Sequence, residues 1–152
     1  MTSKERVLNR EKEQGRTVGH AQALDLQARA PEMNGTQIIA EEGKVPAWDS
    51  AKDYSAWAAG YPVADEDQVW ILLQPHNAAH YPGRPSTLRA LWGLAHTTDP
   101  AAAKPWVAPY GTSGLYMAGE CCTENGGTWR SIQDNNAYSP SAYPAAWERV
   151  NA

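Results

Sequence analysis

The residues of this chain with the clearest chemistry are aromatic rings accompanied by uncharged amides. Trp and Tyr present flat apolar faces that stack on other flat surfaces, including the C–H faces of sugar rings. Gln and Asn hydrogen-bond to hydroxyl groups without adding charge. The candidate sugar-binding residues are Trp129, Gln133, Asn136, Tyr138 and Trp147 near the C-terminus, and Tyr81 and Trp92 earlier in the chain. This mixture predicts a surface that binds a neutral carbohydrate.

The aromatic residues also have a structural interpretation. Trp70 and Trp129 fall in the best strand candidates, where a large ring more often fills the core of a small protein than a binding surface. Tyr81, Tyr138 and Tyr143 fall in Pro-rich loops instead, and loops carry a large share of binding residues. We therefore expect exposed loop tyrosines and buried strand tryptophans.

Side chains capable of catalysis form no known constellation in this sequence. His76 and His80 have the spacing of two metal ligands on one helix face. Pro75 and Pro82 flank them, however, and no third ligand is evident. Ser113 lacks the Gly-x-Ser-x-Gly pattern of a nucleophile elbow, and there is no phosphate-binding Gly loop or dinucleotide fingerprint. We therefore expect no enzymatic activity, no metal and no cofactor.

The elements that would position the aromatic residues occur twice, because the sequence repeats at a shift of 59 residues. Both copies contain Gly-x9-Trp-x3-Gln-x2-Asn-Ala, and each closes on a further Trp. The corresponding positions are Trp57 and Tyr116, Gly60 and Gly119, Trp70 and Trp129, Gln74 and Gln133, and Asn77 and Asn136. The repeat predicts two superposable three-stranded modules in tandem, each built around a Trp.

Local turn signals place the strands within each copy. The second copy predicts a β-hairpin over residues 115–133, with its turn at 123–127, because Asn-Gly tolerates the positive φ of tight hairpin turns. In the first copy, the strand candidate 68–74 follows an acidic turn at 65–67. A serine that precedes residues 87–94 predicts a capped short helix there.

The first 45 residues differ in kind from the rest, since they contain no aromatic residue. Helices are expected over residues 3–13 and 17–30, the second ended by Pro31, and a short strand over 37–40. A weak apolar stripe through Val18, Ala21, Leu24 and Ala28 could not bury itself alone. We therefore expect a docking or oligomerisation segment and a homo-oligomer. A solvated helix or tail is the alternative, because the charges nearly balance.

Composition narrows the class of protein. The chain has no Phe but seven Trp and seven Tyr, which suits small cores made by large rings. A net charge of -4 argues against nucleic-acid binding, and no apolar run approaches the roughly 18 residues of a membrane span. The N-terminus lacks the apolar core of a signal peptide. Cys121 and Cys122 are adjacent and would form a strained bridge, so we expect them to be reduced, as in a cytoplasm.

The second copy carries a short pattern of aromatic, Gly and Pro positions. Its residues are Tyr116, Gly119, Glu120, Cys122, a Gly turn, Trp129, Ser131, Asn136, Pro140, Trp147 and Val150. This pattern resembles the family 5/12 carbohydrate-binding modules, the small chitin-binding domains of chitinases. The family has Asp in place of Glu120 and Val in place of Cys122, and the first copy departs further. The resemblance implies a chitin-like or N-acetylated cell-wall glycan as ligand.

A wider pattern extends over most of the chain. It comprises residues 83–94, Lys104-Pro105-Trp106 and residues 109–114. These segments resemble small proteins encoded in the structural gene region of bacteriophages and prophages of Gram-positive bacteria. The resemblance implies a virion component without enzymatic activity, at the tail tip, on a fibre or on the capsid surface. It also implies synthesis in the host cytoplasm and contacts with other virion proteins.

Together these observations predict a mainly β protein with a helical N-terminal segment. The expected parts are a docking segment and connector (1–45), a first carbohydrate-binding-like module (46–97), a linker (98–104) and a second such module (105–152). We expect a virion accessory protein that attaches to host-surface glycan and binds neither nucleic acid nor membrane. The alternatives are a purely structural assembly or decoration protein, and a detached accessory module of a glycan hydrolase.

Overall fold

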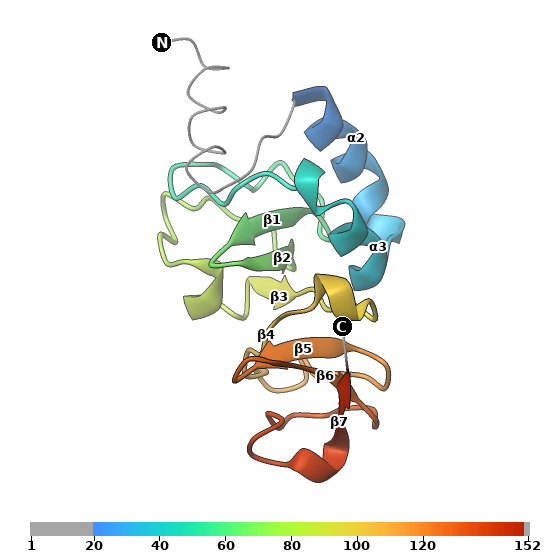
Figure 1. Cartoon of the computed structure of the whole chain (residues 1–152). Coiled ribbons are helices and arrows are strands. Elements are labelled where there is room, and N and C mark those ends of the chain that lie inside the picture. The colour runs from blue at the N-terminus through green and yellow to red at the C-terminus, as the bar shows by residue number, and fades with distance from the viewer. Residues whose placement is uncertain (1–19, 151–152) are drawn as a thin grey trace.

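The computed structural model describes residues 20–150 and contains two small β-sheets preceded by a helical segment (Figure 1). The sheets follow one another along the molecule, and the helices α2 (His20–Arg29) and α3 (Gly35–Ala40) lie beside the first sheet. Single 3-10 turns follow each helix, at Ala30–Glu32 and Glu42–Lys44. The predicted mainly β class with a helical N-terminal segment is confirmed. The helix expected over residues 3–13 lies outside the described residues.

The first sheet is antiparallel and has the strand order β1-β2-β3. Its strands are β1 (Pro62–Asp65), β2 (Gln68–Leu72) and β3 (Trp92–Leu94). The acidic turn between β1 and β2 is as expected, with positive φ at Glu66 and Asp67. The predicted helix over 87–94 is wrong: only Pro85–Thr87 forms a 3-10 turn. The Trp92 ring is buried, and residues Trp92–Leu94 form the strand β3 beside β2 instead of a helix.

The second sheet has four strands in the order β4-β5-β6-β7. They are β4 (Lys104–Pro105), β5 (Cys121–Glu124), β6 (Gly127–Ser131) and β7 (Trp147–Val150). The predicted hairpin is confirmed, and Asn125 and Gly126 form its turn with φ of 51° and 76°. The expected count of three strands is wrong for this sheet, because the two-residue β4 adds a parallel edge to β5.

The two hairpins pair in the same register when shifted by 59 residues. Val63 lies opposite Trp70 in the first sheet, and Cys122 lies opposite Trp129 in the second. The two indole N–H groups donate to equivalent carbonyls, at 3.0 Å in the first hairpin and 3.2 Å in the second. The glycines that precede the hairpins, Gly60 and Gly119, both adopt positive φ and donate to the last residue of the central strand at 2.8 Å.

One pair of positions departs from the ungapped shift. Tyr116 is buried and meets Trp147 edge to face at 5.3 Å between ring centroids. In the first half this arrangement is made by Tyr54 with Trp92, also at 5.3 Å. The expected equivalence of Trp57 with Tyr116 is therefore wrong. Trp57 is half-buried and packs against Tyr54. The first copy has three more residues between its core tyrosine and its Gly than the second copy has, so the ungapped shift pairs the wrong aromatic residues.

Each sheet contributes to a core rich in aromatic rings. In the first, Trp70 and Trp92 are buried with smaller apolar side chains around Tyr54. In the second, Tyr116 and Trp147 are buried, while Trp129 packs at the margin and is only half-buried. The core position expected of Trp70 is thus confirmed, whereas the ring of Trp129 is partly open to solvent.

The helical segment shares a hydrophobic cluster with the first sheet. The buried members are Leu26, Ala30, Ile38, Ile39 and Val45 from the segment, and Ala64, Val69 and Ala95 from the sheet region. The predicted stripe is wrong, since Leu24 is exposed and Leu26 is buried. The buried apolar side chains of this segment therefore pack against the first sheet region of the same chain.

The predicted strand over 37–40 is also wrong, because these residues form α3. The Asn34 side chain accepts the Gln37 backbone N–H, and the Gln37 side chain accepts the Asn34 backbone N–H, each at 2.9 Å. This reciprocal capping box starts a helix despite the β-branched Ile38 and Ile39.

Candidate functional site

Tyr138 and Tyr143 form an exposed aromatic pair at the far end of the second sheet. Their side chains are 55% and 44% exposed. The rings meet edge to face, with centroids 5.6 Å apart and planes at 87°. This is a preferred arrangement of two aromatic rings. The prediction that loop tyrosines are exposed is confirmed, and the structure adds that these two lie side by side.

Hydrogen bonds fix the turn that carries the pair. The carbonyl of Ser139 accepts the N–H groups of Ala142 and Tyr143, at 3.1 and 3.0 Å. The Ser141 N–H donates to Glu124 Oε1 at 2.8 Å, which ties the turn to the β5–β6 hairpin. On the other side, the Trp147 indole N–H donates to the Tyr138 carbonyl at 3.0 Å. The pair is therefore held in place before any ligand arrives.

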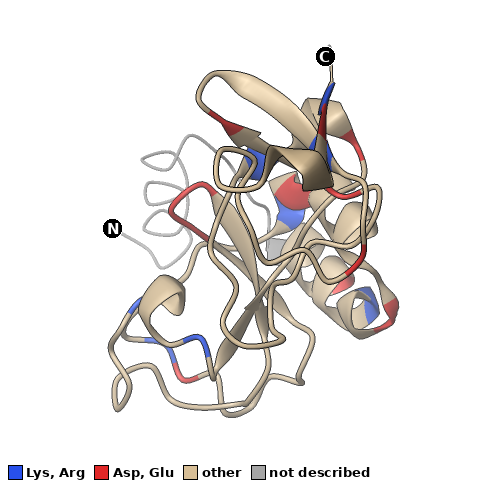
Figure 2. Cartoon of the chain, turned by 90° about the horizontal axis from the view of Figure 1, so that it is seen from below, with Lys and Arg blue, Asp and Glu red and all other residues tan. Residues whose placement is uncertain are grey.

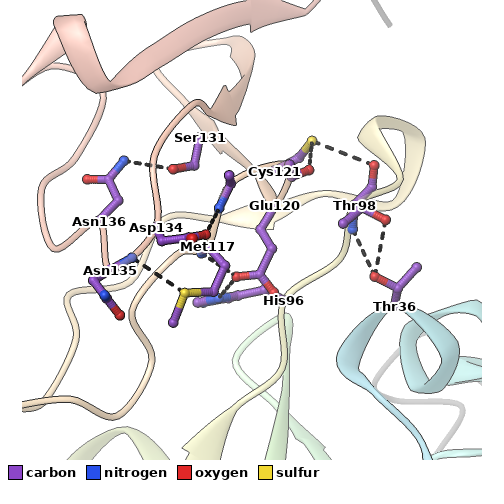
Figure 3. Close-up of polar contacts among 12 residues, drawn as sticks. Thr36, His96, Thr98, Met117, Glu120, Cys121, Ser131, Asp134, Asn135 and Asn136 are labelled. Atoms are coloured by element: carbon purple, nitrogen blue, oxygen red, sulfur yellow. Dashed lines mark hydrogen bonds and ion pairs between the residues drawn. The ribbon is translucent and has the colours of Figure 1, made fainter.

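Three of the predicted sugar-binding residues lie in the interior. Trp92 and Asn136 are fully buried, and Trp147 is 5% exposed. Asn136 Nδ2 donates to the Ser131 hydroxyl at 3.1 Å (Figure 3). It also donates to the Ala146 carbonyl at 3.4 Å. These three side chains belong to the cores and to the loops beneath the surface, and they do not face solvent.

The other two residues predicted in the second half lie nearer to solvent. Gln133 is exposed just after β6. Trp129 is half-buried, and the Arg149 guanidinium lies 5.4 Å from the ring centroid. One face of this ring is therefore occupied by a cation–π contact, so Trp129 offers less flat surface than the two tyrosines.

Tyr81 is the exposed aromatic residue predicted in the first half. Its side chain is 54% exposed and its ring meets His76 edge to face at 6.0 Å. His76 is buried, packs against Trp92 at 5.4 Å, and places Nδ1 2.8 Å from the Gln74 carbonyl. His76 therefore supports Tyr81 from the core, and Tyr81 stands without a second exposed ring beside it in the contacts of the described residues.

Charge is evenly distributed around these surfaces. Acidic and basic residues are interspersed over the described part of the chain (Figure 2), and five cations have carboxylate partners. They are Arg29, Lys44, Arg84, Lys104 and Arg130. No helix within residues 20–150 is long and apolar enough to cross a membrane. The segment 135–146, which carries the tyrosine pair, contains no charged residue, and its Ser141 N–H donates to the Glu124 carboxylate. A surface without basic residues suits an uncharged ligand better than a phosphate-rich one.

The two cysteines are free and buried in β5. Burial raises the pKa of the Cys122 thiol to about 12, and burial also raises the pKa of Cys121. A thiol reacts as its thiolate, so neither side chain has the properties of a nucleophile.

Residues 96–98, which the sequence analysis did not single out, make contacts with two other parts of the chain. The Thr36 hydroxyl accepts the Thr98 N–H at 3.0 Å, and His96 Nδ1 lies 3.4 Å from Glu120 Oε1 (Figure 3). These contacts join the helical segment, the first sheet and the second sheet. No local sequence pattern indicated them, because the partners are 62 and 24 residues apart in the chain.

No protein-family model matches the chain, and no curated protein matches it at a significant level.

Proposed function

We propose that this chain is an accessory structural protein of a bacteriophage virion, and that it binds a neutral host-surface glycan through the Tyr138–Tyr143 pair. The observation that supports glycan binding is this pair: two exposed rings, held edge to face by a hydrogen-bonded turn. The virion assignment rests on the sequence resemblance described above. In this proposal both sheets are carbohydrate-binding-module-like, and the second one carries the ligand.

A preformed aromatic pair suits sugar binding for an energetic reason. Ordering mobile side chains on binding costs roughly 0.5–1.5 kcal/mol for each, and the turn around Ser139 removes part of that cost in advance. Two rings at 87° present one face and one edge, which fits the alternating apolar and polar surfaces of a pyranose chain. Gln133, exposed on the segment between β6 and the turn, supplies an uncharged amide.

The affinity of a single site of this size is low. We expect a dissociation constant in the range of about 10 μM to 1 mM, equivalent to about 4–7 kcal/mol. Many copies on one particle would raise the effective concentration of sites and compensate for weak single contacts. The proposal therefore requires that several copies of the chain are displayed together.

Binding of the full chain to insoluble chitin and to host cell walls tests the glycan role. Tyr138→Ala and Tyr143→Ala should each reduce the retained protein about five- to tenfold. The matched control is Tyr110→Ala, because Tyr110 is 58% exposed and belongs to the same half of the chain but lies outside the pair. Circular dichroism should show all three variants folded.

Two results would remove the glycan role. One is the absence of binding by the folded wild-type chain on both materials at high surface density. The other is an equal loss for the Tyr110 variant, which would indicate unspecific adhesion of exposed rings.

The purely structural alternative is favoured by a separate observation. Trp92, Asn136 and Trp147 have the residue types of a sugar site but are buried, so the resemblance itself can be explained by core packing. In that case the chain would still be part of particles while Tyr138→Ala changed neither assembly nor adsorption.

Attachment to the particle is assigned in this proposal to the segment that precedes α2. Leu26 and Ala30 belong to the cluster under the first sheet, so a deletion must spare them. Removal of residues 1–19 should leave the fold intact and abolish incorporation into particles, as measured by mass spectrometry of purified virions. Normal incorporation of the shortened chain would contradict this assignment, and absence of the full-length chain from virions would contradict the virion role.

A further inference from the structure

A cavity of about 450 Å³ lies where the helical segment and the two sheets meet. Three parts of the chain contribute apolar walls to it. They are Met33 and Ile38 from the helical segment, Ile71 and Leu94 from the first sheet, and Leu115 and Met117 from the loop before β5. None of the sugar-binding residues predicted from the sequence lies among the residues that line it.

One wall of the cavity is polar. Glu120 and His96 both line it, and His96 Nδ1 lies 3.4 Å from Glu120 Oε1 (Figure 3). The same carboxylate oxygen accepts the Met117 N–H at 2.7 Å. The side chain of His96 is 6% exposed and that of Glu120 is 23% exposed. The carboxylate is thus fixed by two neighbours and still open to a ligand.

The polar groups of this wall are hydrogen-bond acceptors. A His96 ring that donates to Glu120 through Nδ1–H and carries no second proton has Nε2 as an acceptor. Nε2 is buried and has no hydrogen-bond partner among the described residues. Among the residues that line the cavity, Glu120 alone is charged. Two cations lie beside lining residues: Arg29 Nη1 is 3.9 Å from Met33 Sδ, and a Cβ added to Gly114 would stand 2.7 Å from Arg89 Nη2.

Close backbone packing gives the cavity a firm boundary. A Cβ added to Gly35 would stand 2.3 Å from the His96 carbonyl oxygen, so α3 begins in direct contact with the residue that carries the imidazole. The two methionines on the apolar walls have unbranched side chains, and such side chains adapt to ligands of different shape. Apolar side chains together with a few fixed polar groups are a usual composition for a small-molecule site.

We propose that this cavity binds a small amphipathic primary amine, with the ammonium group at Glu120 and the apolar body against Met33, Ile71 and Met117. The ammonium group donates hydrogen bonds and neutralises the one charge of the lining, and the apolar body removes hydrophobic surface from water. This site is separate from the tyrosine pair, and binding there requires no glycan.

The methionines provide a direct measurement. The chain has three Met residues, of which Met33 and Met117 line the cavity and Met1 is remote in sequence from both. With 13C-labelled methionine methyl groups, 4-phenylbutylamine should shift the Met33 and Met117 signals through the ring current of its phenyl group. The isosteric probes 4-phenylbutanol and 4-phenylbutyrate test the charge preference. We expect the amine to bind about tenfold more tightly than the alcohol, and the carboxylate to cause no shift.

Glu120→Gln is the decisive variant, because its amide oxygen can still accept the Met117 N–H while the charge is lost. It should remove the preference of the amine over the alcohol. Glu148→Gln is the matched control, since Glu148 is exposed on β7 and pairs with Arg130; this variant should bind as the wild type does. Tyr138→Ala should also keep amine binding, which separates this proposal from the glycan role.

The proposal is overturned if neither methyl signal moves in the wild type. It is equally overturned if the carboxylate probe shifts them as much as the amine, or if the amine keeps its advantage in Glu120→Gln.

Discussion

The imidazole of His96 lies flat against the phenol ring of Tyr116, with ring centroids 3.7 Å apart and planes 12° from parallel. His96 follows β3 of the first sheet and Tyr116 precedes β5 of the second, and both are buried. Nearby, the Cys121 N–H donates to the Thr97 carbonyl at 2.8 Å. The stack therefore joins the two sheets through side chains at the point where the backbone also connects them.

Loss of this stack should destabilise the whole chain. His96→Ala removes the ring and leaves a cavity, and we expect a loss of about 2–4 kcal/mol in the free energy of unfolding. His96→Phe keeps a flat ring and should recover more than half of that loss. Urea unfolding followed by Trp fluorescence measures both. Equal destabilisation by the two variants would show that the contact with Glu120, and not stacking, dominates.

The equivalent tryptophans of the two hairpins should differ in their contributions. Trp70 is 1% exposed, so Trp70→Ala should cost about 3–5 kcal/mol. Trp129 is half-buried with Arg149 on its face, so Trp129→Ala should cost about half as much, since less surface leaves water on folding. Denaturant unfolding of both variants provides the comparison. Equal costs would contradict the difference in burial.

Two leucines of α2 form a matched pair for testing the role of the helical segment. Leu26 is fully buried in the cluster with Val69, and Leu24 is 52% exposed. Leu26→Ala should reduce the free energy of unfolding by about 2–4 kcal/mol, whereas Leu24→Ala should change it by less than about 0.5 kcal/mol. Thermal unfolding distinguishes them. A neutral Leu26→Ala would mean that α2 is not part of the cooperative fold.

Acid should loosen the attachment between α2 and the turn that follows α3. Hydrogen bonds from Arg29 and then Lys44 lower the pKa of Glu41 to about 2, from 4.5. A lowered folded-state pKa contributes stability that is fully present above about pH 4.5 and is lost as the pH falls toward 2. The melting temperature should therefore decline across this window. Glu41→Gln should make that decline shallower; an unchanged slope would assign the acid sensitivity to other carboxylates.

The adjacent thiols should resist modification in the folded chain. Cys122 is fully buried with its pKa raised to about 12, and Cys121 is 2% exposed. At pH 8 both should react with a disulfide reagent only after unfolding, because the reactive thiolate is scarce and inaccessible. The rate of colour development with and without denaturant measures this. Rapid reaction of one thiol per folded chain would contradict the burial of β5.

The hairpins could be predicted because their determinants are local. Asn125-Gly126 favours the positive φ that the turn adopts, and the spacing of Trp70 and Trp129 transfers the strand register from one copy to the other. Tyr54 was missed because an ungapped shift cannot represent three extra residues in a loop. The position of Tyr54 depends on its packing against Trp92. Trp92 is distant in the sequence, so no local sequence pattern indicates this contact.

For α3, the sequence contains a helix-start signal, but the strand propensity of two isoleucines outweighed that signal in the prediction. Ile38 and Ile39 have strand propensity, whereas Asn34 followed three residues later by Gln37 is the signature of a capping box. The burial of both isoleucines beneath the first sheet decides in favour of the helix. The contact of His96 with Glu120 had no such signal, because its partners are 24 residues apart and belong to different sheets. For the tyrosine pair, the position in a Pro-rich loop predicted that both rings are exposed, but it did not predict that they contact each other.

The short strand β4 has a consequence for molecules held close together. It covers the outer edge of β5 with only two residues, and one of them, Pro105, has no backbone N–H to offer. At the opposite edge of the sheet, β7 exposes the charged pair Glu148 and Arg149. Short, proline-containing or charged edges are poor templates for a further strand. Dense arrays of this chain should therefore resist aggregation by strand addition, and contacts between neighbouring copies must form through side-chain surfaces instead.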